Sequence, residues 1–565
     1  MNPPATRRGL LRPLAFFALL AFLCTQPLGS HTPGAKAAPA ADTADPLLQA
    51  MLQELERSKS QLKMENMLTP YYIEYRVAEV DEYAAEAVFG ALRQEHRLHL
   101  RVLRAVVRVG DYKQDSYFGQ GQGFAEVIPL DNDPLAIRHQ LWWVTDRAYK
   151  AAIEALTAKQ AMLKQFKVDQ PVDDFARAPS LESIGPLARL DMDAKRWRSA
   201  LETATALFRQ DAEVQSLEAA LRFTAVNRYL VSSEGTVIRR GQCLYQLSLN
   251  GSTQASDGML LERSPYYLVG SEKELPAPEK FTADTAKMLE TLKKLREAPL
   301  IEEEYRGPVL MFADAANDVF AGLVGPNVVG RKPAPGKSSR TTGSYATSYK
   351  SRVLPEFLSV VDDPTLANFN GHSLVGGYQV DDEGVKAARV PVVENGELIN
   401  YLLGRQPIRD FPGSNGHGRA SPGGFPIPSL GVLIMRSSQT ASREELKAKM
   451  LDICRKRDLP YGYLVETLGP QLSPRLLYRV WAKDGREELV RGGVFHEFDT
   501  RELRNDLIAV GNDPEVSNRP GGIPTTVIAP SMLFGELEVK RADTTKEKLP
   551  DYPPPALTAP RERKP

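Results

Sequence analysis

The chain has 565 residues, of which 42% are hydrophobic and 25% charged, and its 71 basic side chains balance its 71 acidic ones. A single hydrophobic core rarely supports such a length, so we expect about two to four domains. A formal net charge of zero provides no global attraction for nucleic acid or for an anionic membrane, and the composition gives no support to a nucleic-acid partner.

Residues 1–37 have the pattern of a signal peptide. Basic residues at the start precede an apolar run from Leu14 to Leu23, which is too short for a permanent membrane span. We therefore expect an exported protein, periplasmic or extracellular, with a short linker over 38–45 and no stable membrane span after cleavage. The sequence does not distinguish the general secretory route from the twin-arginine route.

Residues 46–125 are predicted to form an N-terminal α+β domain. Asp45-Pro46 is a typical helix start, and apolar residues follow it at helical spacing. Alternating apolar residues predict a strand over 71–77 and another over 97–109. In the second strand the apolar phase shifts between Val102 and Ala105, which predicts a β-bulge.

Residues 126–270 are predicted as a central region of helices and strands, and 271–299 as a connecting helix. Asp133-Pro134 combines an N-cap with a proline in the first helical turn, and the helix it opens extends toward Phe166. A second helix is expected over 197–208. The turn at 233–235 lies between two short apolar runs and predicts a β-hairpin.

Residues 300–540 are predicted to form a β-rich C-terminal domain, with helices at 313–325 and 441–457. Asn395-Gly396 between two apolar runs is a strong signal for a type I′ hairpin. The tail over 541–565 is rich in Lys, Pro and Arg and is predicted to be disordered. The expected fold class is thus α+β: an N-terminal α/β region with an antiparallel sheet and inserted helices, followed by the β-rich domain.

Two cysteines, Cys243 and Cys454, remain after the predicted cleavage. Their separation permits one disulfide in an oxidising compartment, but two buried thiols are favoured in a chain of this size. The sequence does not decide between these states. It contains no Cys-x-x-Cys pair, so a structural zinc site is not indicated.

Four turns in the C-terminal half carry a recognisable pattern. They are Asp381-Asp382-Glu383-Gly384, Glu394-Asn395-Gly396-Glu397-Leu398, Asn415-Gly416-His417-Gly418-Arg419 and Gly511-Asn512-Asp513. Together they resemble the TldD/PmbA proteins, the "modulator of DNA gyrase" metalloprotease family. The resemblance implies a dimerising C-terminal domain and peptide hydrolysis by a zinc subunit, which is often partnered by a metal-free sister subunit.

The helix at which the family holds its zinc lacks every ligand in this chain. In the zinc-bearing members the segment matching 321–326 reads H-E-x-x-x-H, whereas this chain has Ala321, Gly322 and Pro326 at the three positions. The family's third ligand is a cysteine shortly after the Gly-Asn-Asp turn, and no cysteine follows Cys454. Since zinc hydrolysis needs three protein ligands and a base, the comparison implies no catalytic residue, no metal and no cofactor here, with zinc expected only in a partner subunit.

The resemblance also suggests residues that line a substrate cleft: Asp382, Glu383, Gly384, Asn415, His417 and Arg419. The expected function is that of an exported, metal-free, TldE-like subunit that helps to bind an extended peptide. Its partner would be a zinc-bearing paralogue or a second copy of itself. The alternatives are a stand-alone, non-catalytic peptide-binding or scaffold protein, and a protease with relocated chemistry; the sequence does not separate them.

Overall fold

Long antiparallel strands dominate the first half of the fold in a computed structural model, which describes residues 45–166 and 172–543. The predicted signal peptide, all of the linker except Asp45, and the tail beyond residue 543 lie outside the described residues. The strands are β1 (Tyr72–Val88), β2 (Ala91–Arg108), β3 (Phe124–Ile128), β4 (Glu182–Ile184), β5 (Val214–Ser232), β6 (Val237–Gln254), β7 (Leu260–Arg263) and β8 (Tyr266–Val269).

These eight strands form one sheet, although the sequence suggested two regions that meet near residue 125. The strand order is β3-β2-β1-β5-β6-β4, and both β7 and β8 pair with β6. β1 therefore pairs with β2 on one side and with the much later β5 on the other. Four helices lie against the sheet: α1 (Pro46–Gln61), α2 (Pro134–Leu163), α3 (Ala194–Thr205) and α4 (Pro278–Glu297).

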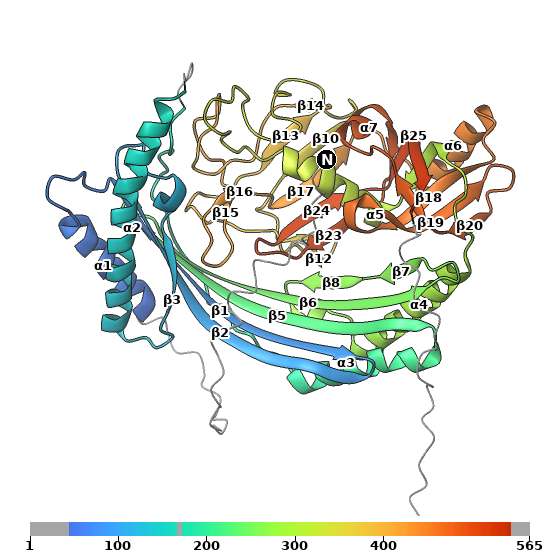
Figure 1. The fold of residues 1–565 in the computed structure, drawn as a ribbon, viewed down its shortest axis with the longest axis horizontal. Coiled ribbons are helices and arrows are strands. Elements are labelled where there is room, and N and C mark those ends of the chain that lie inside the picture. Colours follow the sequence, from blue (N-terminus) through green and yellow to red (C-terminus); the bar gives the residue numbers. More distant parts are fainter. Residues whose placement is uncertain (1–44, 167–171, 544–565) are drawn as a thin grey trace, which may run out of the picture. The chain divides into compact units, whose positions relative to one another are not determined.

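The helices cover one face of the sheet, in two groups at opposite ends (Figure 1). Side chains of α1 and α2 pack on Tyr75, Val77 and Leu103 of β1 and β2. At the other end, α3 and α4 pack on Phe223 and Leu247 of β5 and β6. The opposite face of the sheet is concave and faces the C-terminal half of the chain (Figure 1).

The bulge predicted in the second strand is wrong. β2 pairs with β1 without a shift from Arg108 down to Gln94, and the one irregularity lies near the hairpin end, between Glu86 and Ala87. The apolar residues of β2 switch from even-numbered to odd-numbered positions because both faces of the strand contact apolar side chains. Leu103 packs under the helices, whereas Leu100 packs on the concave face.

The C-terminal half contains two larger sheets around one core. The first has the order β14-β13-β10-β17-β24-β23, and the second has the order β20-β19-β18-β9-β25-β21 with β22 also paired to β25. Their strands are β9 (Tyr305–Met311), β10 (Leu358–Asp362), β13 (Val390–Glu394), β14 (Glu397–Leu398), β17 (Val432–Ser437), β18 (Tyr461–Leu468), β19 (Pro474–Trp481), β20 (Glu487–Val490), β21 (Gly493–Phe495), β22 (Leu507–Val510), β23 (Glu515–Arg519), β24 (Thr525–Ala529) and β25 (Met532–Arg541).

Two short hairpins and three helices complete this half. The hairpins pair β11 (Asn368–Phe369) with β12 (His372–Ser373), and β15 (Gly418–Arg419) with β16 (Ile427–Pro428). The helices are α5 (Ala313–Val319), α6 (Arg443–Lys456) and α7 (Thr500–Asn505). A π-helical turn over Phe320–Val324 continues α5. The expected α+β class and the β-rich C-terminal half are thus confirmed.

Local sequence signals account for several element boundaries. The Asp133 carboxylate accepts hydrogen bonds from the backbone N–H groups of Leu135 and Ala136, which caps α2 as predicted. Ser442 and Glu445 form a reciprocal capping box at the start of α6. Both central residues of the Asn395-Gly396 turn have positive φ, at 48° and 80°, as a type I′ turn requires.

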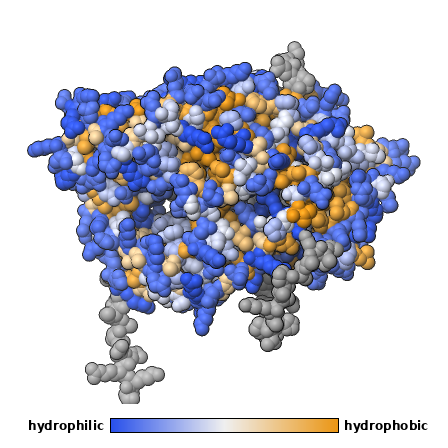
Figure 2. All heavy atoms as spheres, turned by 180° about the vertical axis from the view of Figure 1, so that it is seen from behind, coloured by the Kyte–Doolittle hydropathy of each residue, from blue (hydrophilic) through white to orange (hydrophobic). Residues whose placement is uncertain are grey.

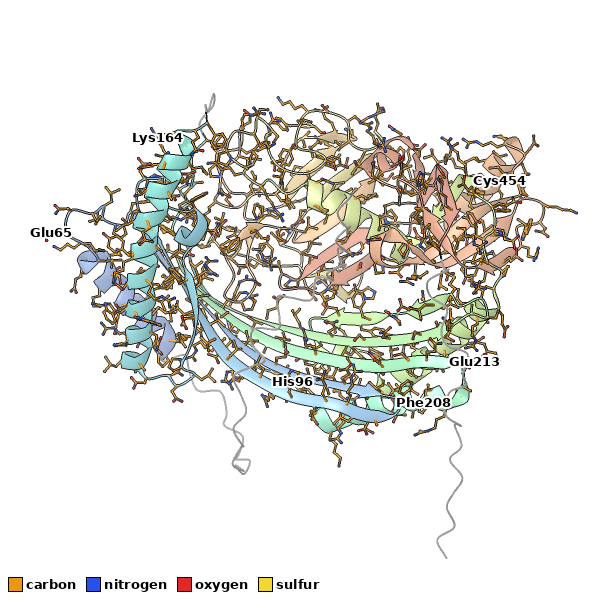
Figure 3. The ribbon with its side chains drawn as sticks, in the orientation of Figure 1. Glu65, His96, Lys164, Phe208, Glu213 and Cys454 are labelled. Atoms are coloured by element: carbon orange, nitrogen blue, oxygen red, sulfur yellow. The ribbon has the colours of Figure 1, made fainter. Side chains whose placement is uncertain are left out.

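Both cysteines of the described chain are free thiols. Cys243 is half-buried on β6, whereas Cys454 is buried on α6 in the C-terminal half (Figure 3). Hydrophilic side chains dominate the face seen in Figure 2, where hydrophobic ones gather in separate patches. Among the described residues, no helix is long and apolar enough to cross a membrane.

Replacing Gly396 by Ala should destabilise the fold more than the same change at Gly371. Both glycines have positive φ, so each Ala variant incurs about 1–2 kcal/mol of backbone strain. At Gly396 the added Cβ would also meet the Leu354 carbonyl oxygen at 2.4 Å, whereas nothing lies within 4 Å of it at Gly371. Thermal unfolding of the two variants measures the difference, and equal decreases in Tm would contradict the tight approach at the hairpin.

Candidate functional site

A large cleft, of about 560 Å³, lies where the edge of the N-terminal sheet meets the C-terminal half. One wall is the β7–β8 segment over residues 262–269. The opposite wall consists of α5 and β23, and the loop over 467–470 closes part of the rim. Since ligand sites are usually the largest well-formed concavities with a few polar groups, this cleft is the first candidate.

Two strand edges border the cleft. β23 is the last strand of its six-stranded sheet, and β8 pairs only with β6 among the described strands. Asn518 joins the two edges, because its Nδ2 donates to the Leu268 carbonyl at 2.9 Å while its own carbonyl accepts from the Tyr266 hydroxyl at 3.0 Å. Strand edges of this kind can bind an extended peptide through backbone hydrogen bonds.

Helix α5 presents three polar side chains to the cleft, namely Asp314, Asn317 and Asp318. Asn317 is only 1% exposed; its Nδ2 donates to the Glu515 carbonyl at 3.1 Å, but its Oδ1 accepts no hydrogen bond from the described protein. An unsatisfied buried acceptor is unfavourable unless a ligand or water donates to it. This carbonyl oxygen is therefore available to a donor in the cleft.

The cleft carries more negative than positive charge. Its lining includes five carboxylates but only two arginines, Arg263 and Arg475. Loss of hydration in the cleft, together with the carboxylates of Asp318 and Glu515, raises the pKa of Asp314 to about 6. Asp318 pairs with Arg519 at 2.6 Å, whereas Asp314 has no ion pair or hydrogen bond among the described residues. A positively charged ligand group would relieve this repulsion.

The zinc-motif positions offer no ligand atoms. Ala321 is half-buried, Gly322 and Pro326 are exposed, and all three follow the cleft-lining part of α5 by one to three turns. α5 contacts β23, the strand after the Gly511-Asn512-Asp513 turn, but the three motif positions lie beyond α5, in the turns over Phe320–Val324 and Gly325–Asn327. Their side chains do not fit zinc. Within residues 45–166 and 172–543, no three His, Cys, Asp or Glu side chains cluster to hold a metal.

The six residues predicted to line a substrate cleft lie together, but none of them lines the large cleft. They occupy the turn at 381–384 and the segment at 415–419, and Asp382 lines a smaller cavity against the N-terminal sheet. Asn415 holds neighbouring backbone, since its Oδ1 accepts from the Leu403 N–H at 2.7 Å and its Nδ2 donates to the Tyr401 carbonyl at 2.8 Å. Their role in substrate binding stays a prediction.

His417 is fully buried and forms an ion pair or hydrogen bond with Asp362. Its Nε2 lies 3.2 Å from Asp362 Oδ1, and Asp362 also accepts from the backbone N–H groups of Gly431 and Val432. The ring is fixed on its other side, where Nδ1 lies 3.1 Å from the Asn415 carbonyl. His417 thus braces the 415–419 segment against β10 and does not reach solvent.

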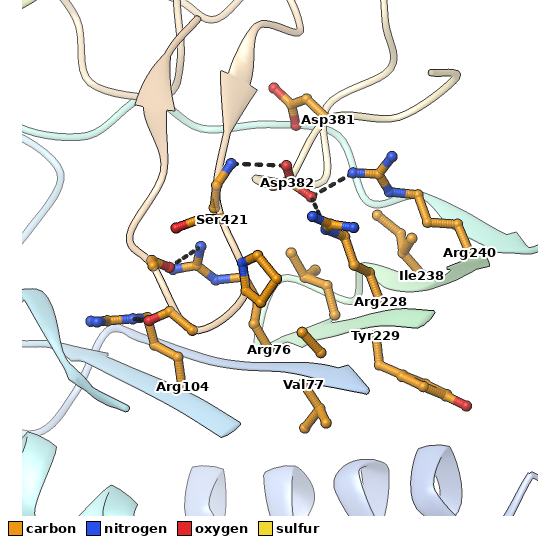
Figure 4. Close-up of a pocket in the computed structure, with 16 residues that line it drawn as sticks. Arg76, Val77, Arg104, Arg228, Tyr229, Ile238, Arg240, Asp381, Asp382 and Ser421 are labelled. Atoms are coloured by element: carbon orange, nitrogen blue, oxygen red, sulfur yellow. Dashed lines mark hydrogen bonds and ion pairs between the residues drawn. The ribbon is translucent and has the colours of Figure 1, made fainter. Parts of the chain in front are cut away.

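Asp382 is the centre of the densest ion-pair network. Its Oδ1 lies 2.5 Å from Arg240 Nη2 and 3.6 Å from Arg228 Nε (Figure 4). Its Oδ2 lies 3.3 Å from Arg419 Nε. The backbone N–H of Ala420 also donates to Oδ2 at 2.9 Å. These three arginines hold the pKa of Asp382 well below its usual range, against the effect of burial.

The carboxyls on either side of Asp382 have the opposite shift. Burial, reinforced by the neighbouring Glu383, raises the pKa of Asp381 to about 8. Burial also raises the pKa of Glu383, whose Oε2 accepts from the Arg405 N–H at 2.5 Å. Gly418 is required here, because a Cβ at that position would lie 2.1 Å from Glu383 Oε2.

Sequence reasoning missed the arginines that surround this turn. Arg405 is 2% exposed and ties three segments together, since it donates to the Ala176 carbonyl and pairs with Glu234 at 2.7 Å. Arg76 and Arg228 lie in the long strands β1 and β5. Their side chains alternate with the strand so that they share the concave face of the sheet with apolar residues such as Ala78 and Val226. A charged residue in the apolar phase of a strand is the signal that would have identified them.

Replacing Asp382 by Asn should destabilise the protein far more than replacing Asp81 by Asn. Loss of the Asp382 charge leaves the buried Arg419 and the half-buried Arg228 and Arg240 without a carboxylate, and breaking a buried pair typically costs about 3–5 kcal/mol. Asp81 pairs with an exposed guanidinium, that of Arg97, and exposed pairs contribute about 0–1 kcal/mol. Chemical unfolding at pH 7 measures both differences.

The effect of Asp382→Asn should depend on pH. Because the folded-state pKa of Asp382 is depressed, its contribution is fully present above the unfolded pKa of about 4 and is lost as the pH falls toward the folded value. The free energies of unfolding of parent and variant should therefore converge in acid. An Asp382→Asn effect no larger than that of Asp81→Asn, or one independent of pH, would contradict the network.

Known proteins resemble this chain in both sequence and fold. Residues 304–541 match the PmbA/TldA metallopeptidase C-terminal domain. A metalloprotease of Archaeoglobus fulgidus is 28% identical over 127 residues, and one of Methanocaldococcus jannaschii is 30% identical over 97 residues. These alignments cover 22% and 17% of this chain, and the chain spans only 26% and 20% of the respective relatives.

Solved structures share the fold over most of the chain. A candidate modulator of a DNA gyrase from Thermotoga maritima and TldE from Thermococcus kodakarensis each give a TM-score of 0.57, at 16% and 13% identity respectively. Each alignment covers 87% of this chain and 99% of the other. Residues 304–541 thus form a C-terminal domain of the PmbA/TldA metallopeptidase family, and the chain shares the fold of these solved structures.

Proposed function

We propose that this protein is a non-catalytic, TldE-like subunit of a TldD/PmbA peptidase system, in which it helps to bind an extended peptide. The cleft carries the proposal, because it has two strand edges for a peptide backbone but no ligand set where the family places zinc. Hydrolysis would then belong to a partner subunit that carries the zinc ligands. This chain would supply backbone hydrogen bonds and the charge of the cleft wall.

The proposal includes export. The N-terminal pattern of basic residues and a short apolar run supports a periplasmic or extracellular location. A zinc-bearing paralogue is the proposed partner, with a second copy of this chain as the alternative. The chain itself is proposed to contain no metal.

A stand-alone peptide-binding protein on the same fold is the second candidate. The absence of ligand atoms at 321, 322 and 326 favours it as much as it favours a partner subunit. The two candidates differ in what accompanies the protein, since only the first requires a family member with H-E-x-x-x-H. A protease with relocated chemistry is the third, and peptide cleavage that survives a chelator would support it.

Peptide binding should depend on the peptide backbone. An unstructured peptide that contains lysine should bind the full chain. The same peptide with N-methyl groups on alternate residues, in one of the two registers, should bind at least about tenfold more weakly. The reason is that each lost backbone hydrogen bond contributes about 0.5–1.5 kcal/mol. The peptide methylated in the other register is the matched control. Equal affinity of all three peptides, measured by fluorescence anisotropy, would exclude binding by strand addition.

Native purification should recover a second family member that carries H-E-x-x-x-H, with zinc bound to that partner. The separated chain should contain far less than one zinc, because the side chains at 321, 322 and 326 provide no lone pairs. Elemental analysis of the two separated chains measures this distribution. Recovery of the chain alone would favour the stand-alone candidate, and one zinc per separated chain would contradict the loss of the site.

A further inference from the structure

A second, smaller cavity lies between the concave face of the long-strand sheet and the C-terminal segment over 420–424 (Figure 4). Its volume of about 40 Å³ accommodates about three waters, or a single ion of similar size. Four arginines line it: Arg76, Arg104, Arg228 and Arg240. The large cleft has an entirely different lining, so the two concavities are separate features.

The register of the sheet sets these arginines against one another. Arg76 of β1 lies directly opposite Arg104 of β2, and Arg228 of β5 lies directly opposite Arg240 of β6. Ala78 of β1 lies between the two pairs. It is directly opposite Arg228 and two residues after Arg76, on the same face of the strand. Like charges directly opposite on adjacent strands are destabilising. Two such pairs on one half-buried face therefore favour the binding of anions.

The protein supplies too few carboxylates to neutralise them. Glu74 pairs with Arg76 at 2.6 Å, and Asp382 is shared by Arg228, Arg240 and Arg419. Arg104 donates only to backbone carbonyls, such as that of Gly423 at 2.7 Å. The other aspartate of the lining is Asp381, and even with both aspartates ionised the cations of the cavity outnumber the anions.

Arg228 is the least satisfied member of the cavity. Its guanidinium donates no hydrogen bond to any described residue, and its one contact with a carboxylate is the 3.6 Å approach to Asp382. Burial, together with the repulsion of Arg240 and Arg419, lowers the pKa of Arg228 to about 10. Burial and the charge of Arg76 likewise lower the pKa of Arg104. Guanidinium groups stay protonated at neutral pH, so the missing interaction is an anion.

We propose that this cavity is a binding site for a small tetrahedral oxyanion, phosphate or sulfate, held by Arg228 and Arg240. Planar guanidinium groups donate two parallel hydrogen bonds to such oxygens, and these charge-assisted bonds are about twice as strong as neutral ones. The bound ion joins β5 and β6 of the N-terminal sheet to the Asp382 turn. It thereby stabilises the contact between the two halves of the chain.

Inorganic phosphate tests the site directly on the full chain. Equilibrium dialysis should give one phosphate per chain, and phosphate should raise Tm relative to chloride at equal ionic strength. Arg228→Gln should weaken phosphate binding at least about tenfold, as expected for loss of a charged hydrogen-bond donor. Because Arg228 donates no hydrogen bond in the ion-free protein, the variant should be at least as stable as the parent in chloride. Arg97→Gln, on the exposed end of the same sheet, should leave phosphate binding unchanged.

A second pair of variants tests whether a carboxylate of the protein can replace the bound anion. Ala78→Asp places a carboxylate opposite Arg228, so it should fold and should no longer bind phosphate. Val80→Asp is the matched control, because Val80 lies on the same face opposite Leu100 and Val226, away from the arginine pairs, and should lower Tm strongly. Absence of phosphate binding by the parent, or unchanged binding by both Arg228→Gln and Ala78→Asp, would overturn the proposal. Binding of acetate but not of phosphate or sulfate would also overturn it.

Discussion

One buried carboxylate, that of Asp382, joins several segments of the two halves of the fold. It receives arginines from the long strands of the N-terminal sheet and from the C-terminal segment that follows His417. A buried carboxylate with one guanidinium would gain little over apolar packing, because desolvation offsets the attraction. The Asp382 carboxylate pairs with several guanidinium groups and accepts a hydrogen bond from one backbone N–H. It is therefore a fixed point that holds β5, β6 and the segment over 419–420 together.

This fixed point explains the two concavities. The C-terminal half is held over the concave face of the sheet, and the large cleft is the space left where β8 approaches β23. Near the Asp382 turn the surfaces come closer, and only the small arginine-lined cavity remains. One arrangement thus produces a wide acidic cleft and a narrow basic cavity, which suit ligands of opposite charge.

The large cleft places helix α5 beside the edge strand β23. α5 contacts β23, and positions 321, 322 and 326 lie in the helical turns that directly follow α5. The side chains at these three positions carry no atom that typically ligates zinc. The core between the C-terminal sheets packs against α5 and holds it in place.

The sequence by itself determined the features that depend on short-range chemistry. Asp133 before Pro134 specified the start of α2, and Asn395-Gly396 specified a hairpin. Each of these follows from backbone conformations or side-chain atoms of a few adjacent residues, so no knowledge of distant segments is needed.

Only the tertiary structure decided which distant residues meet. It joined the strands before and after residue 125 into one sheet, buried His417 against Asp362, and brought Arg76 and Arg228 to the same cavity. The sequence could not determine these contacts, because alternation along a strand identifies two faces but not what covers each of them. Pairing between strands far apart in the chain, and the neutralisation of buried charge, fixed that choice.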